Sequence, residues 1–180
     1  NSRHRVIFSN SGNANCFNGK SGKRAVSRSL ELLSKSLEVP KSQIFLASTG
    51  IIGRAFPVKK IEAAIPALVS HLSRQGGHHA AHGILTTDTH PKEMAVRFSV
   101  GGKRVTLAAM AKGAGMVCPE MNASGIRKGR HATMLCFLTT DLHISKSLLQ
   151  RALSEAVDLT FNKMVIDNDQ STNDMVLVLA

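Results

Sequence analysis

The sequence contains no tryptophan and no tyrosine, and aromatic residues make up only 4% of the chain. Proteins that bind nucleic-acid strands commonly stack bases on aromatic rings, so this chain offers few stacking platforms. Its 23 Lys and Arg residues outnumber 12 Asp and Glu residues and give a net charge of +11, which by itself favours a nucleic-acid surface. Because the basic residues are scattered, we expect no nucleic-acid partner. Attraction of carboxylate-bearing metabolites, or merely a solvated surface, is the simpler interpretation of the charge.

Long apolar runs and paired cysteines are missing too. No run of 18 apolar residues occurs, so the sequence predicts no membrane-spanning helix and no membrane partner. The three cysteines, Cys16, Cys118 and Cys136, form neither a CxxC pair nor a Cys/His metal-ligand spacing. An odd number without a secretory signal fits a reducing compartment, so we expect a cytoplasmic protein. Because the chain starts without methionine and ends in MVLVLA, we expect a longer natural polypeptide, and an upstream organelle-targeting segment stays open.

The rest of the composition is that of a folded globular chain, with 43% hydrophobic and 19% charged residues. Strand-like stretches alternate with amphipathic helices, which predicts an α/β fold. The predicted strands are residues 3–9, 43–48, 83–89, 94–100, 103–109, 134–139 and the closing MVLVLA. Apolar residues at helical spacing predict helices after Gly22, over 58–72 and after Ser145. Pro66 predicts that the second helix either kinks or divides into two.

Two polar stretches have some features of metal sites. His78, His79 and His82 lie in and after a predicted loop at 73–79, but no acidic or cysteine partner lies beside them as in HExxH. The stretch DNDQSTND at 167–174 lacks the glycine and the distal Glu of a calcium-binding EF-hand loop. We therefore expect a surface histidine cluster, a polar loop before the last strand, and no bound metal.

The motif STGIIG, residues 48–53, follows a predicted strand. A glycine at that place allows the backbone to approach a ligand closely, and the pair Thr49 and Gly50 offers a hydroxyl and an N–H that can stabilise an oxyanion. An ordinary strand-to-helix turn is the other interpretation, and the motif alone favours it because short glycine motifs are common.

Residues 112–135, KGAGMVCPEMNASGIRKGRHATML, combine a glycine-rich turn with an Ala132-Thr133 bond that precedes a strand. A threonine becomes an effective nucleophile when it is the first residue of a chain, because its own α-amine then serves as general base. Lys112 beside three small residues can reach a substrate carboxylate, although a lone lysine is usually a solvated surface group. Taken alone, both signals are weak.

Several motifs taken together are more specific. NSGNAN, STGIIG, TTDT, GGKRVTLAAMAKGAGM, ATML, TTD and DNDQSTND occur in this order between Asn10 and the closing MVLVLA. In this respect the sequence resembles the ornithine acetyltransferase/glutamate N-acetyltransferase family of arginine biosynthesis. It is similar to the central segment, which includes the end of the α chain and the start of the β chain.

The resemblance implies an α/β fold of mixed sheets layered with helices, of the self-processing N-terminal-nucleophile-like (ornithine acetyltransferase/DmpA-like) type. It implies that residues 1–132 belong to an α chain and residues 133–180 to a β chain, separated by self-cleavage at Ala132-Thr133. Thr133 then carries an acetyl group from N-acetylornithine to glutamate through an acetyl-threonine intermediate. By the same resemblance, Thr49 and Gly50 are the oxyanion-stabilising pair.

The remaining expectations also follow from the resemblance. Thr86, Lys112 and Thr133 are the substrate-binding residues in this chain. No cofactor is bound, and acetyl-CoA is a possible acetyl donor. The partners are N-acetylornithine and glutamate as substrates, the missing remainder of the α and β chains, and a second copy of each in an α2β2 assembly.

One departure from the family pattern falls beside the nucleophile. Ten residues, from Asn122 to His131, separate Met121 from the ATML segment and include three Arg or Lys. The insertion either bulges outward and leaves the scissile bond in place or disables processing, because misplacement by about 1 Å can cost a hundredfold in rate. Two alternatives therefore stay open: a self-processing amidase or aminopeptidase of similar fold, and a non-catalytic basic binding fragment.

Overall fold

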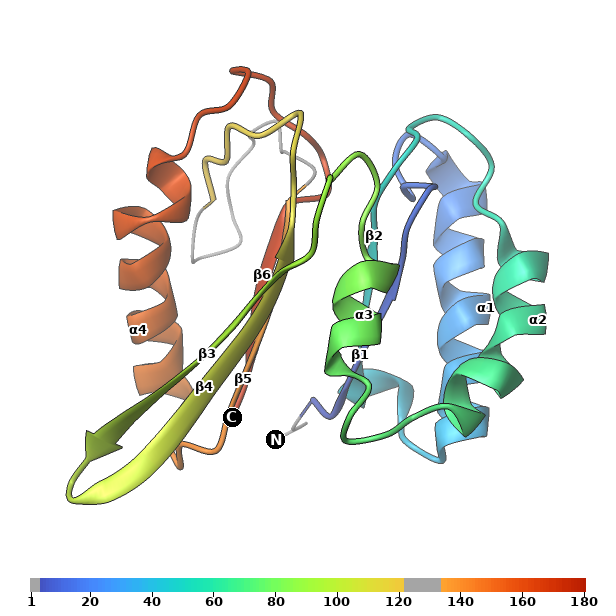
Figure 1. The fold of residues 1–180 in the computed structure, drawn as a ribbon. Helices are drawn as coiled ribbons and strands as arrows, with labels where there is room; N and C mark the ends of the chain where they lie inside the picture. Colours follow the sequence, from blue (N-terminus) through green and yellow to red (C-terminus); the bar gives the residue numbers. More distant parts are fainter. Residues whose placement is uncertain (1–3, 122–133) are drawn as a thin grey trace. The chain divides into compact units, whose positions relative to one another are not determined.

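The computed structural model of the protein describes residues 4–121 and 134–180 (Figure 1). The chain forms two compact units, Asn1–Thr86 and Thr87–Ala180. The first unit holds most of the helices, and the second holds most of the sheet.

The first unit is built on two parallel strands, β1 (Val6–Asn10) and β2 (Ile44–Ser48), which pair in register from Val6–Ile44 to Asn10–Ser48. The long helix α1 (Gly19–Leu37) connects them, as parallel pairing requires. The helices α2 (Val58–Ser70) and α3 (Gly77–Gly83) follow, with a short 3-10 turn, η1 (Lys41–Gln43), before β2.

The core of the first unit lies where α1 packs against α2 and against β2. Its buried members come from all three elements and the segments beside them: Ala25, Leu33, Val39, Ile44, Phe56, Ile61 and Ile65. Leu33 is 3% exposed and Ile65 is 2% exposed. Burial of apolar area of this kind is the main term that stabilises such a unit.

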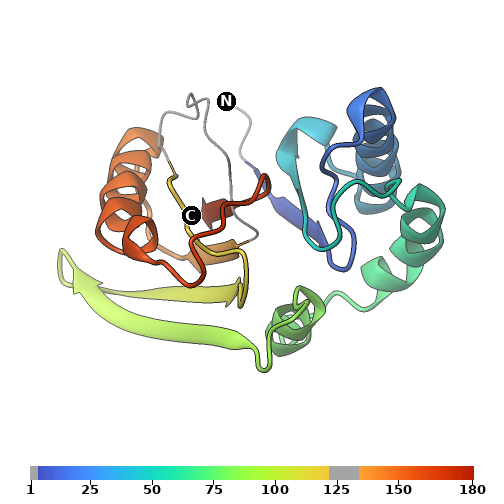
Figure 2. The same cartoon turned by 90° about the horizontal axis from the view of Figure 1, so that it is seen from above.

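The second unit contains a four-stranded sheet in the order β3-β4-β5-β6. The strands are β3 (Lys92–Val100), β4 (Lys103–Lys112), β5 (Leu135–Thr140) and β6 (Met175–Leu179). The first three are antiparallel neighbours, whereas β5 and β6 are parallel. The helix α4 (Lys146–Leu159), capped by the Ser145 hydroxyl, and the short turn η2 (Phe161–Lys163) lie between β5 and β6 along the chain (Figure 2).

One end of each of the four strands lies at the same edge of this sheet. Lys112 at the end of β4 pairs with Leu135 at the start of β5, and Leu135 pairs with Met175 at the start of β6. Lys92, the first residue of β3, pairs with Ala111. The sheet therefore brings together Lys112 and the first described residues after Thr133.

The main sequence predictions of the fold are confirmed, with three corrections. The predicted strand at 83–89 is wrong: α3 ends at Gly83, and turns and bends follow. Its side chains make other contacts instead of extending a sheet: the Asp88 carboxylate accepts hydrogen bonds from the Lys92 Nζ and the Gly113 N–H, and the Thr89 hydroxyl bonds to the His90 ring. The predicted loop at 73–79 is wrong in its second half, where α3 begins at Gly77. Only a single helix spans Val58–Ser70, with Pro66 inside it, so division into two helices is wrong.

The predicted boundary between an α chain, 1–132, and a β chain, 133–180, is a covalent division and stays a prediction. It falls inside the second unit, whereas the two compact units meet at Thr86 and Thr87. Among the described residues, no helix has the length and hydrophobicity that crossing a membrane requires.

The cysteines differ sharply in accessibility, which predicts their reactivity. Cys136, on β5, is 3% exposed, and burial raises the pKa of its thiol to about 11. Cys16 and Cys118 are half-buried. Because the thiolate is the reactive form, we expect iodoacetamide at pH 8 to alkylate Cys16 and Cys118 well before Cys136. Peptide mass spectrometry after timed quenching checks this order, with urea-unfolded protein as the control in which all three react.

Candidate functional site

Lys112 lies buried at the shared end of the sheet, where it is 3% exposed. Its position as the last residue of β4 places it opposite Leu135, which is fully buried. Burial lowers the pKa of the Lys112 ammonium; the Asp88 and Asp174 carboxylates oppose this decrease, and the positive charge of Lys92 adds to it. We call Asp88, Lys92, Lys112 and Asp174 the Lys112 cluster.

Asp88 is the first carboxylate of the Lys112 cluster, and its side chain is fully buried. Its Oδ1 accepts a hydrogen bond from the Lys92 Nζ at 2.6 Å and another from the backbone N–H of Gly113 at 2.8 Å. A buried carboxylate is stable when it is paired and hydrogen-bonded in this way. Asp88 therefore fixes the backbone directly after Lys112.

Asp174 is the second carboxylate and lies just before β6. Its Oδ1 accepts a hydrogen bond from the backbone N–H of Met134, and the N–H of Met175 donates to the Met134 carbonyl at 2.9 Å. Met134 is 3% exposed. The nitrogen that Asp174 binds belongs to the peptide bond that joins Thr133 to Met134.

The predicted nucleophile and scissile bond lie outside the described residues. These are Thr133 and Ala132, together with the ten-residue insertion at 122–131. The last described residue before them, Met121, is held at both backbone groups: its N–H donates to the Asn162 Oδ1 and its carbonyl accepts from the Asn162 Nδ2, each at 2.8 Å. Both described neighbours of residues 122–133 are thus anchored to the second unit.

The stretch DNDQSTND has a structural task that the sequence did not predict. The Asp167 carboxylate accepts hydrogen bonds from the backbone N–H groups of Met116 at 2.5 Å and Val117 at 3.0 Å. These bonds, with a further one from the Asp169 N–H, hold the pKa of the Asp167 carboxyl below its usual value. The polar loop predicted there therefore fixes the backbone at the end of the KGAGM turn through the Asp167 carboxylate. Among residues 4–121 and 134–180, no group of three or more His, Cys, Asp or Glu is placed to hold a metal.

Loss of the Asp167 carboxylate is expected to loosen the KGAGM turn. In Asp167→Ala, the amides of Met116 and Val117 lose their acceptor, so their hydrogen exchange should become faster at neutral pH. In the wild type, the stabilisation is complete above the usual carboxyl pKa of 3.8 and is lost as the pH falls through the lower folded value. Asp169→Ala is the control, because Asp169 takes part through its backbone. Equal exchange in both variants contradicts the prediction.

Thr49 and Gly50 lie in the first unit, at the end of β2, where two loops meet. The Thr49 N–H donates to the Asn10 carbonyl at 3.0 Å, and the Ile51 N–H donates to the Gly12 carbonyl at 3.3 Å. Thr49 is fully buried. Because the Thr49 N–H already donates to the Asn10 carbonyl, the groups predicted to stabilise an oxyanion are the Thr49 hydroxyl and the Gly50 N–H.

Gly50 is required by its backbone and its neighbours. Its φ is +122°, and a Cβ added there would lie 2.3 Å from the Gly12 carbonyl carbon and 2.6 Å from the Asn13 nitrogen. Only glycine allows the NSGNAN and STGIIG loops to approach this closely. The strand-to-helix turn and the oxyanion interpretation of the motif are therefore compatible with the same geometry.

Thr86, the third predicted substrate-binding position, is exposed at the end of the first unit, in the bend that follows α3. Lys112 belongs to the second unit. Asp88 and Asp174 are the functional candidates that sequence reasoning missed. The available signal was their place in polar motifs ahead of strands, since Asp88 lies in TTDT beside Thr86 and Asp174 lies in DNDQSTND directly before β6.

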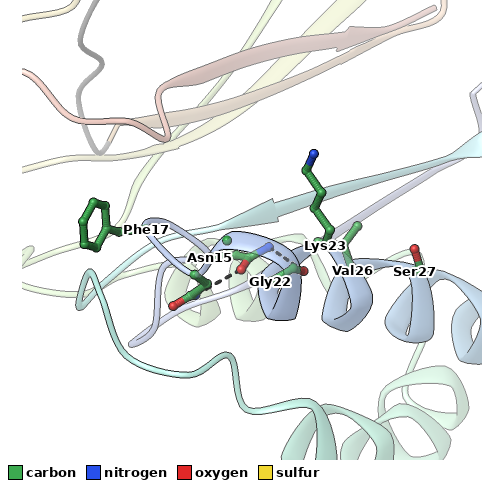
Figure 3. Close-up of a pocket in the computed structure, with 8 residues that line it drawn as sticks. Asn15, Phe17, Gly22, Lys23, Val26 and Ser27 are labelled. Carbon is green, nitrogen blue, oxygen red and sulfur yellow. Dashed lines mark hydrogen bonds between the residues drawn. The ribbon is translucent and has the colours of Figure 1, made fainter.

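A groove of about 510 Å³ lies at the start of α1 (Figure 3). Its lining includes Asn15, Phe17 and Lys23. The Asn15 Nδ2 donates to the Gly22 carbonyl at 3.2 Å, so the polar groups here hold the helix start together. None of the predicted site residues lines this groove.

Known proteins match the whole chain. The ArgJ family profile covers residues 1–180. The arginine biosynthesis bifunctional protein ArgJ of Symbiobacterium thermophilum is 44% identical over 175 residues, which are 97% of this chain and 41% of that protein. The glutamate N-acetyltransferase of Methanocaldococcus jannaschii is 44% identical over 180 residues, which are 99% of this chain and 42% of that protein. The chain thus spans about two fifths of the length of these relatives.

Two solved structures share the fold. The crystal structure of the arginine biosynthesis bifunctional protein argJ from Bacillus halodurans is 32% identical with a TM-score of 0.59, over 64% of this chain and 61% of that one. The structure of ornithine acetyltransferase from Mycobacterium tuberculosis complexed with ornithine is 30% identical with a TM-score of 0.56, over 64% and 62%. These similarities confirm the α/β fold predicted from the sequence.

Proposed function

The chain belongs to the ArgJ family, and on this premise we propose that the full-length protein is a glutamate N-acetyltransferase of arginine biosynthesis. It transfers the acetyl group of N-acetylornithine to glutamate. The observation that carries the proposal is the buried Lys112, which pairs across β4 and β5 with Leu135, two residues after Thr133. Names of the matched relatives, including a structure complexed with ornithine, support the same substrate class.

Self-cleavage comes first in the proposed sequence of steps. The Thr133 hydroxyl attacks the Ala132 carbonyl carbon, and the Ala132–Thr133 C–N bond breaks to leave an ester and a free α-amine on Thr133. Water then hydrolyses the ester, which restores the hydroxyl and releases the Ala132 carboxylate. Thr133 becomes an N-terminal residue whose α-amine serves as general base.

Acetyl transfer then proceeds through an acetyl-threonine intermediate. The Thr133 hydroxyl attacks the acetyl carbonyl of N-acetylornithine, and ornithine leaves as its α-amine takes up a proton. The amine of glutamate attacks the ester carbonyl and loses a proton, the bond between the acetyl carbon and the Thr133 oxygen breaks, and N-acetylglutamate leaves as the Thr133 hydroxyl is restored by protonation. The Thr49 hydroxyl and the Gly50 N–H stabilise the oxyanion, and each such donor can contribute about 3 kcal/mol.

Substrate binding is proposed for Thr86, Lys112 and Thr133. The Lys112 ammonium pairs with the substrate carboxylate. The nearby Asp88 and Asp174 carboxylates favour the charged form of this buried lysine, which the pairing requires. The enzyme needs no bound cofactor, and acetyl-CoA is an alternative acetyl donor. We further propose that it acts in the cytoplasm as an α2β2 assembly with the remainder of its two chains.

The decisive experiment uses the full-length protein with N-acetylornithine, in the presence of either glutamate or water alone. Mass spectrometry quantifies ornithine and N-acetylglutamate. A transferase forms both products in equal amounts and releases little ornithine without glutamate. An amidase releases ornithine at the same rate in water, and a non-catalytic basic fragment forms neither product; either result contradicts the proposal.

A further inference from the structure

The Lys112 cluster contains three charged groups that the proposed reaction does not use directly. They are Asp88, Lys92 and Asp174, whose charges act on Lys112 from the segment before β3, from β3 itself and from the segment before β6. The strand on the other side, β5, contributes the apolar Leu135. Charges placed around a buried lysine from three separate segments need a physical account, because an isolated buried cation is unstable.

One carboxylate binds the backbone next to Lys112, and the other binds the backbone next to its cross-strand partner, Leu135. Asp88 accepts a hydrogen bond from the N–H of Gly113, the next residue along the chain. Asp174 accepts one from the N–H of Met134, the residue before the cross-strand partner of Lys112. Each carboxylate therefore fixes a backbone segment beside Lys112 and contributes negative charge near its ammonium group.

We propose that Asp88 and Asp174 are positioning residues for Lys112: they hold the backbone beside Lys112 and beside its cross-strand partner, and their charges favour the ammonium form of the buried lysine. Lys92 takes part as the ion-pair partner of Asp88 at 2.6 Å, which limits how much of the Asp88 charge acts on Lys112. Asp174 supplies the second negative charge. It lies before β6, which neighbours β5, whereas Asp88 lies before β3, which neighbours β4. The inference rests on the proposed function only where Lys112 binds a substrate carboxylate.

The direction in which the titration midpoint of Lys112 moves separates an electrostatic role of the two carboxylates from a role in supporting the fold. Burial and Lys92 favour the neutral form of Lys112, and the two carboxylates favour the ammonium form. Removing one carboxylate charge should therefore lower the pH at which Lys112 titrates. Loosening of the fold should act oppositely, because water then reaches the ammonium and the titration moves up toward that of an ordinary lysine.

The experiment uses full-length protein labelled with 13C-lysine and follows the titration of the Lys112 side chain by NMR. The signal is identified by its absence in Lys112→Met. Asp88→Asn and Asp174→Asn are the test variants, because asparagine retains an oxygen that accepts the backbone hydrogen bond while it removes the charge. A lower titration midpoint in both variants is the expected result, and a midpoint that stays or rises in either variant overturns the assignment of that residue.

Asp141→Asn is the matched control. Asp141 accepts a hydrogen bond from the Thr106 N–H at 2.7 Å at the other end of the same β4–β5 pair, so it tests loss of a similar backbone contact away from Lys112. In Asp141→Asn, the titration midpoint of Lys112 should equal that of the wild type. A decrease equal to that of Asp88→Asn overturns the proposal, because the effect would then be general to the sheet.

Kinetics of the same variants link the cluster to the reaction. If Lys112 binds the substrate carboxylate, Asp88→Asn and Asp174→Asn should raise KM about tenfold, the loss of one charge-assisted interaction, with a smaller change in kcat. The decline of kcat/KM at alkaline pH should also begin at lower pH. Lower NMR midpoints with an unchanged KM support the positioning role and contradict the proposed role of Lys112 in substrate binding.

Discussion

Thr133→Ala is expected to keep the full-length protein as one polypeptide and to abolish acetyl transfer. The substitution removes the hydroxyl that attacks the Ala132 carbonyl and the acetyl carbonyl, so both proposed reactions lose their nucleophile. We expect transfer to fall by at least about a thousandfold, as for other enzymes that lose a covalent nucleophile. A denaturing gel, N-terminal sequencing of the smaller wild-type fragment and the ornithine assay together measure the effect.

Because of the insertion at 122–131, the gel of the wild-type protein is itself a test: it shows whether the chain is cleaved and at which bond. Ala123 and Ser124 form a second small-residue and hydroxyl pair, closer to Met121 than Ala132 and Thr133 are. Ser124→Ala is therefore the control and should cleave and transfer like the wild type. A smaller fragment that begins at Ser124 would falsify the assignment of Thr133, and an uncleaved wild-type protein contradicts self-processing of this insertion-bearing chain.

Gly50→Ala should destabilise the first unit severely. The new Cβ would overlap backbone atoms of Gly12 and Asn13, 2.3 and 2.6 Å away, in a backbone conformation with φ of +122°. The left-handed conformation and the forced separation of two loops add to about 3 kcal/mol. Urea unfolding followed by circular dichroism should show the loss as a lower midpoint, and purified variant should lose transfer in parallel because Thr49 moves with the loop.

Gly53→Ala is the matched control within the same motif. Gly53 also has a positive φ, +77°, but a Cβ there meets nothing within 4 Å. It should therefore lose only the conformational term, about 1 kcal/mol. Equal destabilisation by the two substitutions would show that φ alone, rather than the contact with the 10–15 loop, makes Gly50 necessary.

Most elements of the fold could be predicted because their sequences carry strong periodic or turn signals. The β3–β4 hairpin follows from alternation around Gly101-Gly102, and the α4 cap follows from Ser145 ahead of an amphipathic stretch. The segment from Gly77 to Thr89 could not be predicted. Its short helix depends on burial of Ala81, which is fully buried, and its TTDT stretch binds backbone elsewhere in the chain rather than a neighbouring strand.

The sequence by itself determined the family and named Thr49, Gly50, Thr86, Lys112 and Thr133 as site residues, because ordered motifs are properties of the chain alone. Only the tertiary structure decided that Lys112 is buried, that Asp88 binds the backbone of Gly113 and that Asp174 binds the backbone of Met134 on the neighbouring strand. Asp88 and Asp174 stand 24 residues before and 62 residues after Lys112 in the sequence. Their meeting depends on strand order and register, which arise from long-range pairing and packing. A local pattern of residues carries no information about such contacts.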